Sequence, residues 1–140
     1  MSVGAALGGG ERFGLVCALA MLPDGRLAAG YRLAAGYGAR LDGPIRLWSL
    51  QRRAVDAVLR GHTCQLNALA PLPDGRLLSG SDDRTLKVWD ERALSVRGGA
   101  DTDACAATLA GHTNGVNALA VLPDRSVVSG SWDGTVRVWR

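Results

Sequence analysis

The sequence predicts an all-β protein of three repeated units, each an antiparallel sheet of four short strands. The first observation is an internal repeat: residues 61–90 and 111–139 share most of their pattern at an interval of 50 residues, so that Gly61 corresponds to Gly111. The second is a set of apolar or alternating runs of four to six residues, which are typical of strands. The third is the Pro-Asp-Gly or Asp-Gly turn between the runs, which favours hairpins and leaves no room for helices.

The first unit, residues 13–60, is the most altered of the three. Its stretch at 16–30, VCALAMLPDGRLAAG, precedes the similar stretch LNALAPLPDGRLLSG at 66–80 by the same 50 residues. The hexapeptide RLAAGY then stands twice in succession, beginning at residue 26. This small duplication predicts an enlarged hairpin over residues 31–41.

The second unit covers residues 61–110, with Cys105–Leu109 as its fourth strand after an insertion at 91–104. The third unit covers residues 111–140. Its three apolar or alternating runs are Val116–Val121, Val127–Ser131 and Thr135–Trp139. Since no fourth run follows, we expect the third unit to lack its outer strand.

Three spaced motifs recur together in the second and third units. Gly-His stands near the start, Ser-Gly-Ser followed by an Asp stands in the middle, and Trp stands near the end. With these motifs the sequence resembles the WD40 repeat family over residues 13–140. The resemblance implies β-propeller blades and, because three units are too few to close a propeller, an incomplete ring.

The resemblance also implies a hydrogen-bonded group of four side chains in each complete unit. These are His62, Ser79, Asp83 and Trp89 in the second unit, and His112, Ser129, Asp133 and Trp139 in the third. A buried imidazole, hydroxyl and indole N–H each need a partner, and together they can satisfy one another. In the first unit Ala29 or Ala35 replaces the Ser and only Asp42 and Trp48 remain, so we expect that unit to be the least rigid.

Ser, His and Asp are also the residue types of a hydrolase triad. Because the set recurs once per unit in the middle of strands, we interpret it as structural and predict no enzyme activity. His62 and Cys64, or His112 with Cys105, do not converge on one point, so we predict no metal ion and no cofactor. We expect Asp101 and Asp103, in the glycine-rich insertion, to lie in a solvated loop.

Antiparallel strand order separates the connections onto two faces. The Gly-His loops, the turns of Asp83 and Asp133, and the enlarged hairpin share the first face, and the Pro-Asp-Gly turns and the insertion share the second face. The candidate partner-binding residues, all on the first face, are Tyr31, Arg32, Tyr37, Arg40, Gln65, Asp82, Arg84, Asn114 and Trp132. Trp132 leads this set because it stands where the preceding unit has Asp82; packing against a neighbouring loop is its alternative role.

Composition limits the compartments and ligands. The formal net charge is only +3 and the longest basic run is Arg52-Arg53, so neither nucleic acid nor membrane is an expected partner. Three cysteines at no metal-type spacing favour a reducing compartment, the cytoplasm or the nucleus. The apolar segment Leu15–Leu22 looks like part of a secretion signal, but the same pattern recurs twice downstream, so we expect no secretion.

The predicted function is a non-catalytic protein-interaction scaffold or adaptor. The pattern LPDGR followed by SGS and VW also resembles propellers of ubiquitin-pathway proteins, namely the phospholipase A2-activating type and F-box substrate receptors. The alternatives are a truncated propeller without independent function, a hydrolase, or a nucleic-acid binder.

Two arrangements would supply the missing units. In one, a homo-oligomer completes the ring, with Val3–Leu7 of each chain pairing with Val136–Trp139 of the other. In the other, which the end of the sequence at a motif boundary favours, the chain is an incomplete product or an excerpt of a larger propeller.

Overall fold

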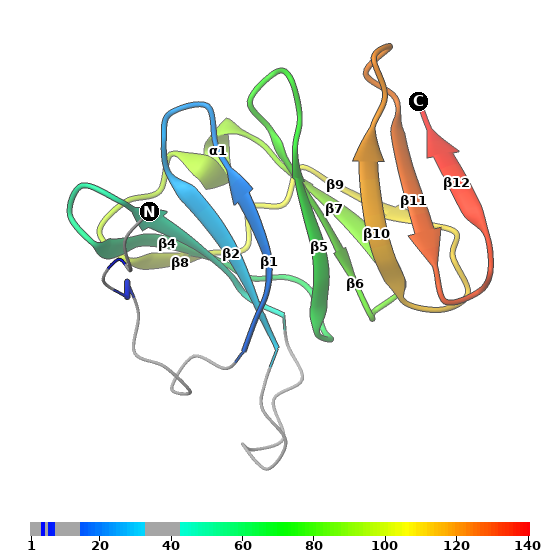
Figure 1. Ribbon diagram of the computed structural model, residues 1–140, viewed down its shortest axis with the longest axis horizontal. Helices are drawn as coiled ribbons and strands as arrows, with labels where there is room; N and C mark the ends of the chain where they lie inside the picture. Colours follow the sequence, from blue (N-terminus) through cyan, green and yellow to red (C-terminus); the bar gives the residue numbers. More distant parts are fainter. Residues whose placement is uncertain (1–3, 5, 8–14, 33–42) are drawn as a thin grey trace.

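In the computed structural model the chain forms three sheets that lie side by side in chain order (Figure 1). The structure describes residues 4, 6, 7, 15–32 and 43–140. Some residues considered above lie outside this part of the chain: Val3, Ala35, Tyr37, Arg40, Asp42 and most of the enlarged hairpin. The predicted all-β class, with antiparallel sheets in an unclosed ring, is confirmed.

The first sheet, at the left of Figure 1, has the strand order β1-β2-β3-β4-β8. Its strands are β1 (Leu15–Met21), β2 (Leu27–Arg32), β3 (Ile45–Ser49), β4 (Ala54–Leu59) and β8 (Ala100–Thr102). The first four pair in antiparallel fashion, whereas β8 pairs in parallel with β4. The fifth strand comes from the insertion of the second unit.

The second and third sheets follow at the centre and right of Figure 1. The second contains β5 (Leu66–Pro71), β6 (Leu77–Ser81), β7 (Thr85–Trp89) and β9 (Ala107–Ala110), and the third contains β10 (Val116–Val121), β11 (Val127–Ser131) and β12 (Val136–Trp139). Within the described chain, the third sheet has the three strands β10, β11 and β12.

The insertion at 91–104 corrects two expectations. It begins with a short helix, α1 (Glu91–Leu94), whose first turn is capped by Asp90 Oδ1 accepting from Arg92 N at 3.1 Å. It then forms β8, which covers the edge of β4 and satisfies backbone groups such as Arg60 N, at 2.8 Å from Thr102 O. The expectation of no helix was wrong. Asp101 lies on β8 and not in a loop, because an unpaired sheet edge offers the insertion a row of hydrogen-bond partners; Asp103 follows the strand, and both carboxylates are exposed as expected.

Neighbouring sheets interlock at glycines. Leu66 of β5 occupies the space that a side chain at Gly30 would need, and Val116 of β10 does the same at Gly80, where an added Cβ would lie 2.7 Å from Val116 Cγ1. Both Leu66 and Val116 are fully buried, and each such burial stabilises the packing by about 2 kcal/mol. At Gly130, by contrast, an added Cβ would meet only side chains of its own sheet, at 3.6 Å.

Polar contacts reinforce the same interfaces. Cys17 Sγ donates to Leu66 O at 2.8 Å between the first and second sheets. Asn67 Nδ2 donates to Val116 O at 2.9 Å between the second and third sheets. Cys17 and Asn67 lie 50 residues apart at equivalent strand positions, so the inter-sheet contact repeats with the sequence.

The two outer faces of the array are apolar and open. On the first sheet, Leu19 and Met21 are exposed, as is Val16, which is 56% exposed at the position equivalent to the buried Leu66. On the third sheet, Val136 and Val138 are exposed. These surfaces are the faces that a neighbouring sheet would cover in a closed propeller.

Candidate functional site

Four side chains of the second sheet meet where the Gly-His loop joins the strands. The Ser79 hydroxyl accepts from Trp89 Nε1 at 2.9 Å and lies 2.7 Å from His62 Nε2, while His62 Nδ1 lies 2.8 Å from Asp83 Oδ2. Because a carboxylate only accepts, His62 Nδ1 carries a proton, and in the neutral imidazole Nε2 accepts the Ser79 O–H. Each buried polar group of the set has a partner.

Asp83 connects this group to two segments of backbone. Its Oδ2 also accepts from Thr63 N at 3.1 Å, and its Oδ1 accepts from Thr85 N at 3.0 Å and the Thr85 hydroxyl at 2.6 Å. Burial raises the pKa of Asp83, but the hydrogen bonds from His62 and Thr85 outweigh burial and hold the pKa well below its usual value. An ionised Asp83 thus fixes the β6–β7 turn against the Gly-His loop.

The third sheet repeats this geometry. His112 Nε2 lies 2.7 Å from Ser129 Oγ, His112 Nδ1 lies 2.9 Å from Asp133 Oδ2, and Trp139 Nε1 donates to Ser129 Oγ at 2.8 Å. The Thr135 hydroxyl and His112 hold the pKa of Asp133 well below its usual value. The β11–β12 turn is therefore held in the same way as the β6–β7 turn.

The position of Ser79 does not suit a nucleophile. Its side chain is fully buried, and its hydroxyl is already engaged with Trp89 and His62. A catalytic serine must face a substrate and an oxyanion hole. In this geometry the hydrogen bonds of the group hold the loop on the sheet.

The first sheet holds its tryptophan differently. Ala29 stands in the register that Ser79 has in the second sheet. Trp48 Nε1 donates instead to Tyr31 Oη at 3.1 Å, and the Arg46 guanidinium stacks on the Tyr31 ring, 4.7 Å from its centroid. Sequence reasoning missed this pair, although Tyr31 lies two residues after Ala29 and therefore on the same side of the strand.

The expectation that Tyr31 lies on the partner-binding face is consequently wrong. Its side chain is buried in a cluster with Ala29 and Trp48. The strand alternation that directs Ala29 inwards also directs Tyr31 inwards, where its hydroxyl has a buried partner to satisfy.

On the first face, the turns of the second and third sheets lie against each other at Gly115. An added Cβ there would lie 2.6 Å from Asp82 Oδ1 and 3.1 Å from Trp132 Cδ1. Trp132 N donates to Gly115 O at 3.0 Å, and Asp82 Oδ1 accepts from Asn67 Nδ2 at 2.6 Å. The Trp132 side chain nevertheless remains 63% exposed.

The remaining predicted members of the first face differ in accessibility. Gln65 and Asp82 are half-buried, whereas Arg84 and Asn114 are exposed. Asn114 Oδ1 accepts from the backbone N–H of Gly115 at 2.7 Å. Arg32 ends β2. Of the predicted residues, Asp82 and Trp132 are the pair that the structure places together, at Gly115.

The described part of the chain contains no group of three or more His, Cys, Asp or Glu side chains placed to bind a metal ion. Its cysteines are free thiols. Among the described residues, no helix has the length and apolar character needed to cross a bilayer.

Comparison with protein families matches the WD domain, G-beta repeat, to residues 54–90 and 103–140, which together exceed half of the chain. Among solved structures, the WD40 beta propeller domain of Doa1 superimposes with a TM-score of 0.68 at 20% identity, over 89% of this chain and 36% of the Doa1 chain. At this identity the structural match shows the fold alone.

Curated relatives are similar over shorter stretches. Nuclear distribution protein PAC1-2 of Uncinocarpus reesii is 37% identical over 68 residues, which is 48% of this chain and 14% of that protein. The CCR4-associated factor 4 homolog of Candida glabrata is 39% identical over 71 residues, or 49% of this chain and 12% of that protein. Ribosome biogenesis protein YTM1 of Eremothecium gossypii is 34% identical over 56 residues, which is 40% of this chain and 12% of that protein. The aligned part is thus a small fraction of each relative.

Proposed function

Because the chain belongs to the WD40 repeat family, we propose that it is a protein-interaction scaffold whose first face, centred on Trp132, contacts a protein partner. WD40 propellers are typically non-catalytic interaction domains, and they generally bind other proteins. The single observation that carries the choice of face is the exposed Trp132 on a turn that Asp133 and His112 hold in place.

Preorganisation favours Trp132 as a contact. A large aromatic side chain on a fixed turn loses little conformational entropy when a partner covers it. Exposed tryptophans that a partner desolvates are enriched among the residues that dominate binding energy. The neighbouring Asp82 supplies a polar group beside the aromatic side chain, and the exposed Arg84 lies on the same turn as Asp82.

Affinity capture with three forms of the chain tests this proposal: wild type, Trp132→Ala and Leu50→Ala. Leu50 is a matched control because it is also an exposed apolar side chain but lies in the β3–β4 turn of the second face. We expect proteins retained by the wild type and by Leu50→Ala to be lost with Trp132→Ala. Retention of the same proteins by all three forms would exclude Trp132 as the contact.

We further propose a role in the ubiquitin pathway and residence in the cytoplasm or nucleus. The repeated LPDGR and VW pattern supports the pathway, and the free thiols together with relatives named for nuclear distribution and ribosome biogenesis support the compartment. Titration of 15N-labelled protein with mono-ubiquitin tests the pathway. Absence of chemical-shift changes on the first face would exclude ubiquitin as its ligand.

A homo-oligomer is a second candidate arrangement, favoured by the unfilled glycine of the third sheet. Val16 is exposed and is equivalent to Leu66 and Val116, which occupy the spaces beside Gly30 and Gly80. The space beside Gly130 has no such occupant, so Val16 of a second chain fits there. Light scattering tests whether the particle has twice the 14.6 kDa chain mass and whether Gly130→Val returns it to the chain mass. A wild-type particle of the chain mass would exclude this arrangement.

A further inference from the structure

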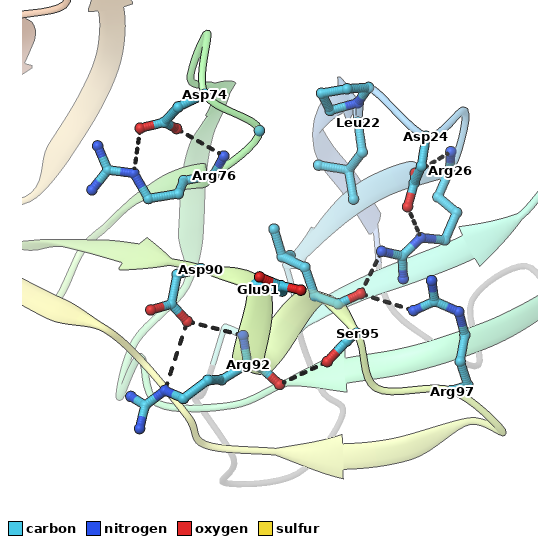
Figure 2. Close-up of a pocket in the computed structure, with 13 residues that line it drawn as sticks. Leu22, Asp24, Arg26, Asp74, Arg76, Asp90, Glu91, Arg92, Ser95 and Arg97 are labelled. Atoms are coloured by element: carbon cyan, nitrogen blue, oxygen red, sulfur yellow. Dashed lines mark hydrogen bonds and ion pairs between the residues drawn. The ribbon is translucent and has the colours of Figure 1, made fainter.

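A pocket on the second face lies between the Pro-Asp-Gly turns of the first two sheets and the insertion that carries α1 (Figure 2). Its volume is about 730 Å³, within the range of binding pockets for small ligands and short peptide segments. Leu22, Pro23 and Leu94 supply apolar surface, and eight charged side chains surround them. The two hydrogen-bonded groups of four side chains described above, which we call the tetrads, contain none of these residues, and neither does the first face.

Most charges of the pocket neutralise one another locally. Arg26 Nε and Arg76 Nε each lie 2.8 Å from the carboxylate two residues earlier, on Asp24 and Asp74. Arg92 Nε lies 3.8 Å from Asp90 Oδ1. Within the described chain this leaves Arg97 as the pocket arginine without a carboxylate partner.

Arg26 and Arg97 meet at one corner, which we call the Arg26–Arg97 corner (Figure 2). Arg26 Nη2 and Arg97 Nη1 both donate to the carbonyl oxygen of Leu94, the latter at 2.8 Å. The Arg26 side chain is only 10% exposed, yet its Nη1 has no hydrogen-bond partner. A buried guanidinium nitrogen without an acceptor is costly, so a small turn of the Arg26 side chain towards an incoming acceptor is favoured.

The positive charge of the Arg26–Arg97 corner lowers the pKa of the neighbouring Asp24. Burial raises the pKa of Asp24, but hydrogen bonds from Arg26 and the charges of Arg26 and Arg97 outweigh it and hold the pKa below its usual value. The shift agrees with the geometry of the two converging guanidinium groups.

The pocket continues into an apolar groove. Leu22 and Pro23 line both the pocket and a second hollow of about 520 Å³. The other residues of this groove come from the corresponding turns of all three sheets: Met21, Pro71, Leu72, Pro73, Val121, Leu122 and Pro123. Charged and apolar recognition surfaces therefore adjoin on the second face.

We propose that the Arg26–Arg97 corner binds the carboxylate of an acidic side chain in an extended peptide segment of a partner protein, with apolar side chains beside it on Leu22, Pro23 and the adjoining groove. Arginine guanidinium groups form strong, directional hydrogen bonds with carboxylates. A singly charged carboxylate suits this pocket better than a phosphate or nucleic acid, because four carboxylates also line it and repel a higher negative charge.

This site lies on the face opposite Trp132, so its failure and the failure of the function proposed above are distinguishable. The probes are terminally blocked pentapeptides with a central Glu and varied apolar neighbours, titrated into the 15N-labelled chain and followed by NMR. Matched peptides carry Gln or phosphoserine at the centre. We expect Glu peptides to shift signals of the pocket and to bind at least tenfold more tightly than Gln peptides, a difference of about 1.4 kcal/mol.

Two arginine variants locate the binding group. Arg97→Gln is expected to weaken the Glu peptide at least tenfold, whereas Arg92→Gln, the same charge change on the same pocket, leaves affinity within twofold. Arg97→Lys keeps the positive charge but lacks the planar, paired N–H donors of the guanidinium group, so it is expected to bind with intermediate affinity. It also replaces Arg97→Gln in the test if thermal unfolding shows that Arg97→Gln does not fold.

The proposal is overturned if no Glu peptide binds, if Gln peptides bind equally well, or if Arg92→Gln weakens binding as much as Arg97→Gln. Tighter binding of phosphoserine peptides, or displacement of the Glu peptide by a single-stranded oligonucleotide, would also overturn the assignment to a carboxylate of a protein.

Discussion

The first and second sheets pack a tryptophan at the same strand position and satisfy its indole N–H with different side chains. In the second sheet Trp89 donates to Ser79, whose hydroxyl continues to His62 and Asp83 and so reaches the Gly-His loop. In the first sheet Trp48 donates to Tyr31 within the same sheet. The comparison teaches that burying the tryptophan requires one acceptor, whereas holding a loop against the sheet requires the whole chain of hydrogen bonds.

The largest effect is expected from Ser79→Ala. This change places in the second sheet the alanine that the first sheet has at Ala29, but without the Tyr31 hydroxyl that serves as acceptor there. The change leaves the buried Trp89 N–H and His62 Nε2 unpaired, so we expect a loss of about 3 kcal/mol in the free energy of unfolding. Urea denaturation measures it. Ser95→Ala, at an exposed site, is the control, and an equally small effect of both changes would contradict the role given to Ser79.

The second-largest effect is expected from acidification, which removes the charge of Asp83 in the second sheet. The pKa of Asp83 is lower folded than unfolded, so its contribution is present above the unfolded value of 3.8 and is lost as pH falls towards the folded pKa. We therefore expect Asp83→Asn to be less stable near neutral pH and to lose less stability than wild type between pH 4 and pH 2. Parallel acid-unfolding profiles of the two proteins would contradict this expectation.

Tyr31→Phe tests the substitute pair of the first sheet. The ring and its packing remain, but the hydrogen bond from Trp48 Nε1 to the Tyr31 hydroxyl is lost, so we expect a loss of about 1 to 2 kcal/mol in the free energy of unfolding. A double-mutant cycle with Trp48→Phe isolates the hydrogen bond. A coupling near zero would show that the two side chains do not depend on each other.

A stabilising change sharpens the comparison of turns. Arg125 has a φ of 69°, in the left-handed region, where the equivalent turns of the first and second sheets have Gly25 and Gly75. Because an L side chain is strained there, we expect Arg125→Gly to raise stability by about 1 kcal/mol. Gly75→Arg is the reciprocal variant, expected to lower it. Thermal unfolding measures both, and a destabilised Arg125→Gly protein would contradict the argument.

The smallest effect on stability is expected from Trp132→Ala. The side chain is mostly exposed and the turn is fixed by Asp133, so unfolding should change by less than about 0.5 kcal/mol even though partner binding is lost. Calorimetry measures the stability. A loss of several kcal/mol would instead favour packing of Trp132 against a neighbouring loop as its role.

Sequence alone predicted the repeated sheets and the residues that the structure brings together in the two tetrads. Strand alternation and turn chemistry are local properties, and the 50-residue interval places equivalent residues at equivalent positions. The position of Trp132 on an exposed turn followed from the same interval. Its role in binding a partner stays a prediction.

What only the tertiary structure decided involves contacts between segments that are distant in the sequence. The partner of Trp48 depends on which side chain of β2 reaches it, and the path of the insertion depends on the free edge of β4 in another sheet. The convergence of Arg26 and Arg97 on Leu94 likewise joins segments of two units. A repeat pattern specifies each unit separately, because the local sequence fixes strand and turn, whereas pairing between distant segments depends on which donors, acceptors and apolar surfaces folding leaves side by side.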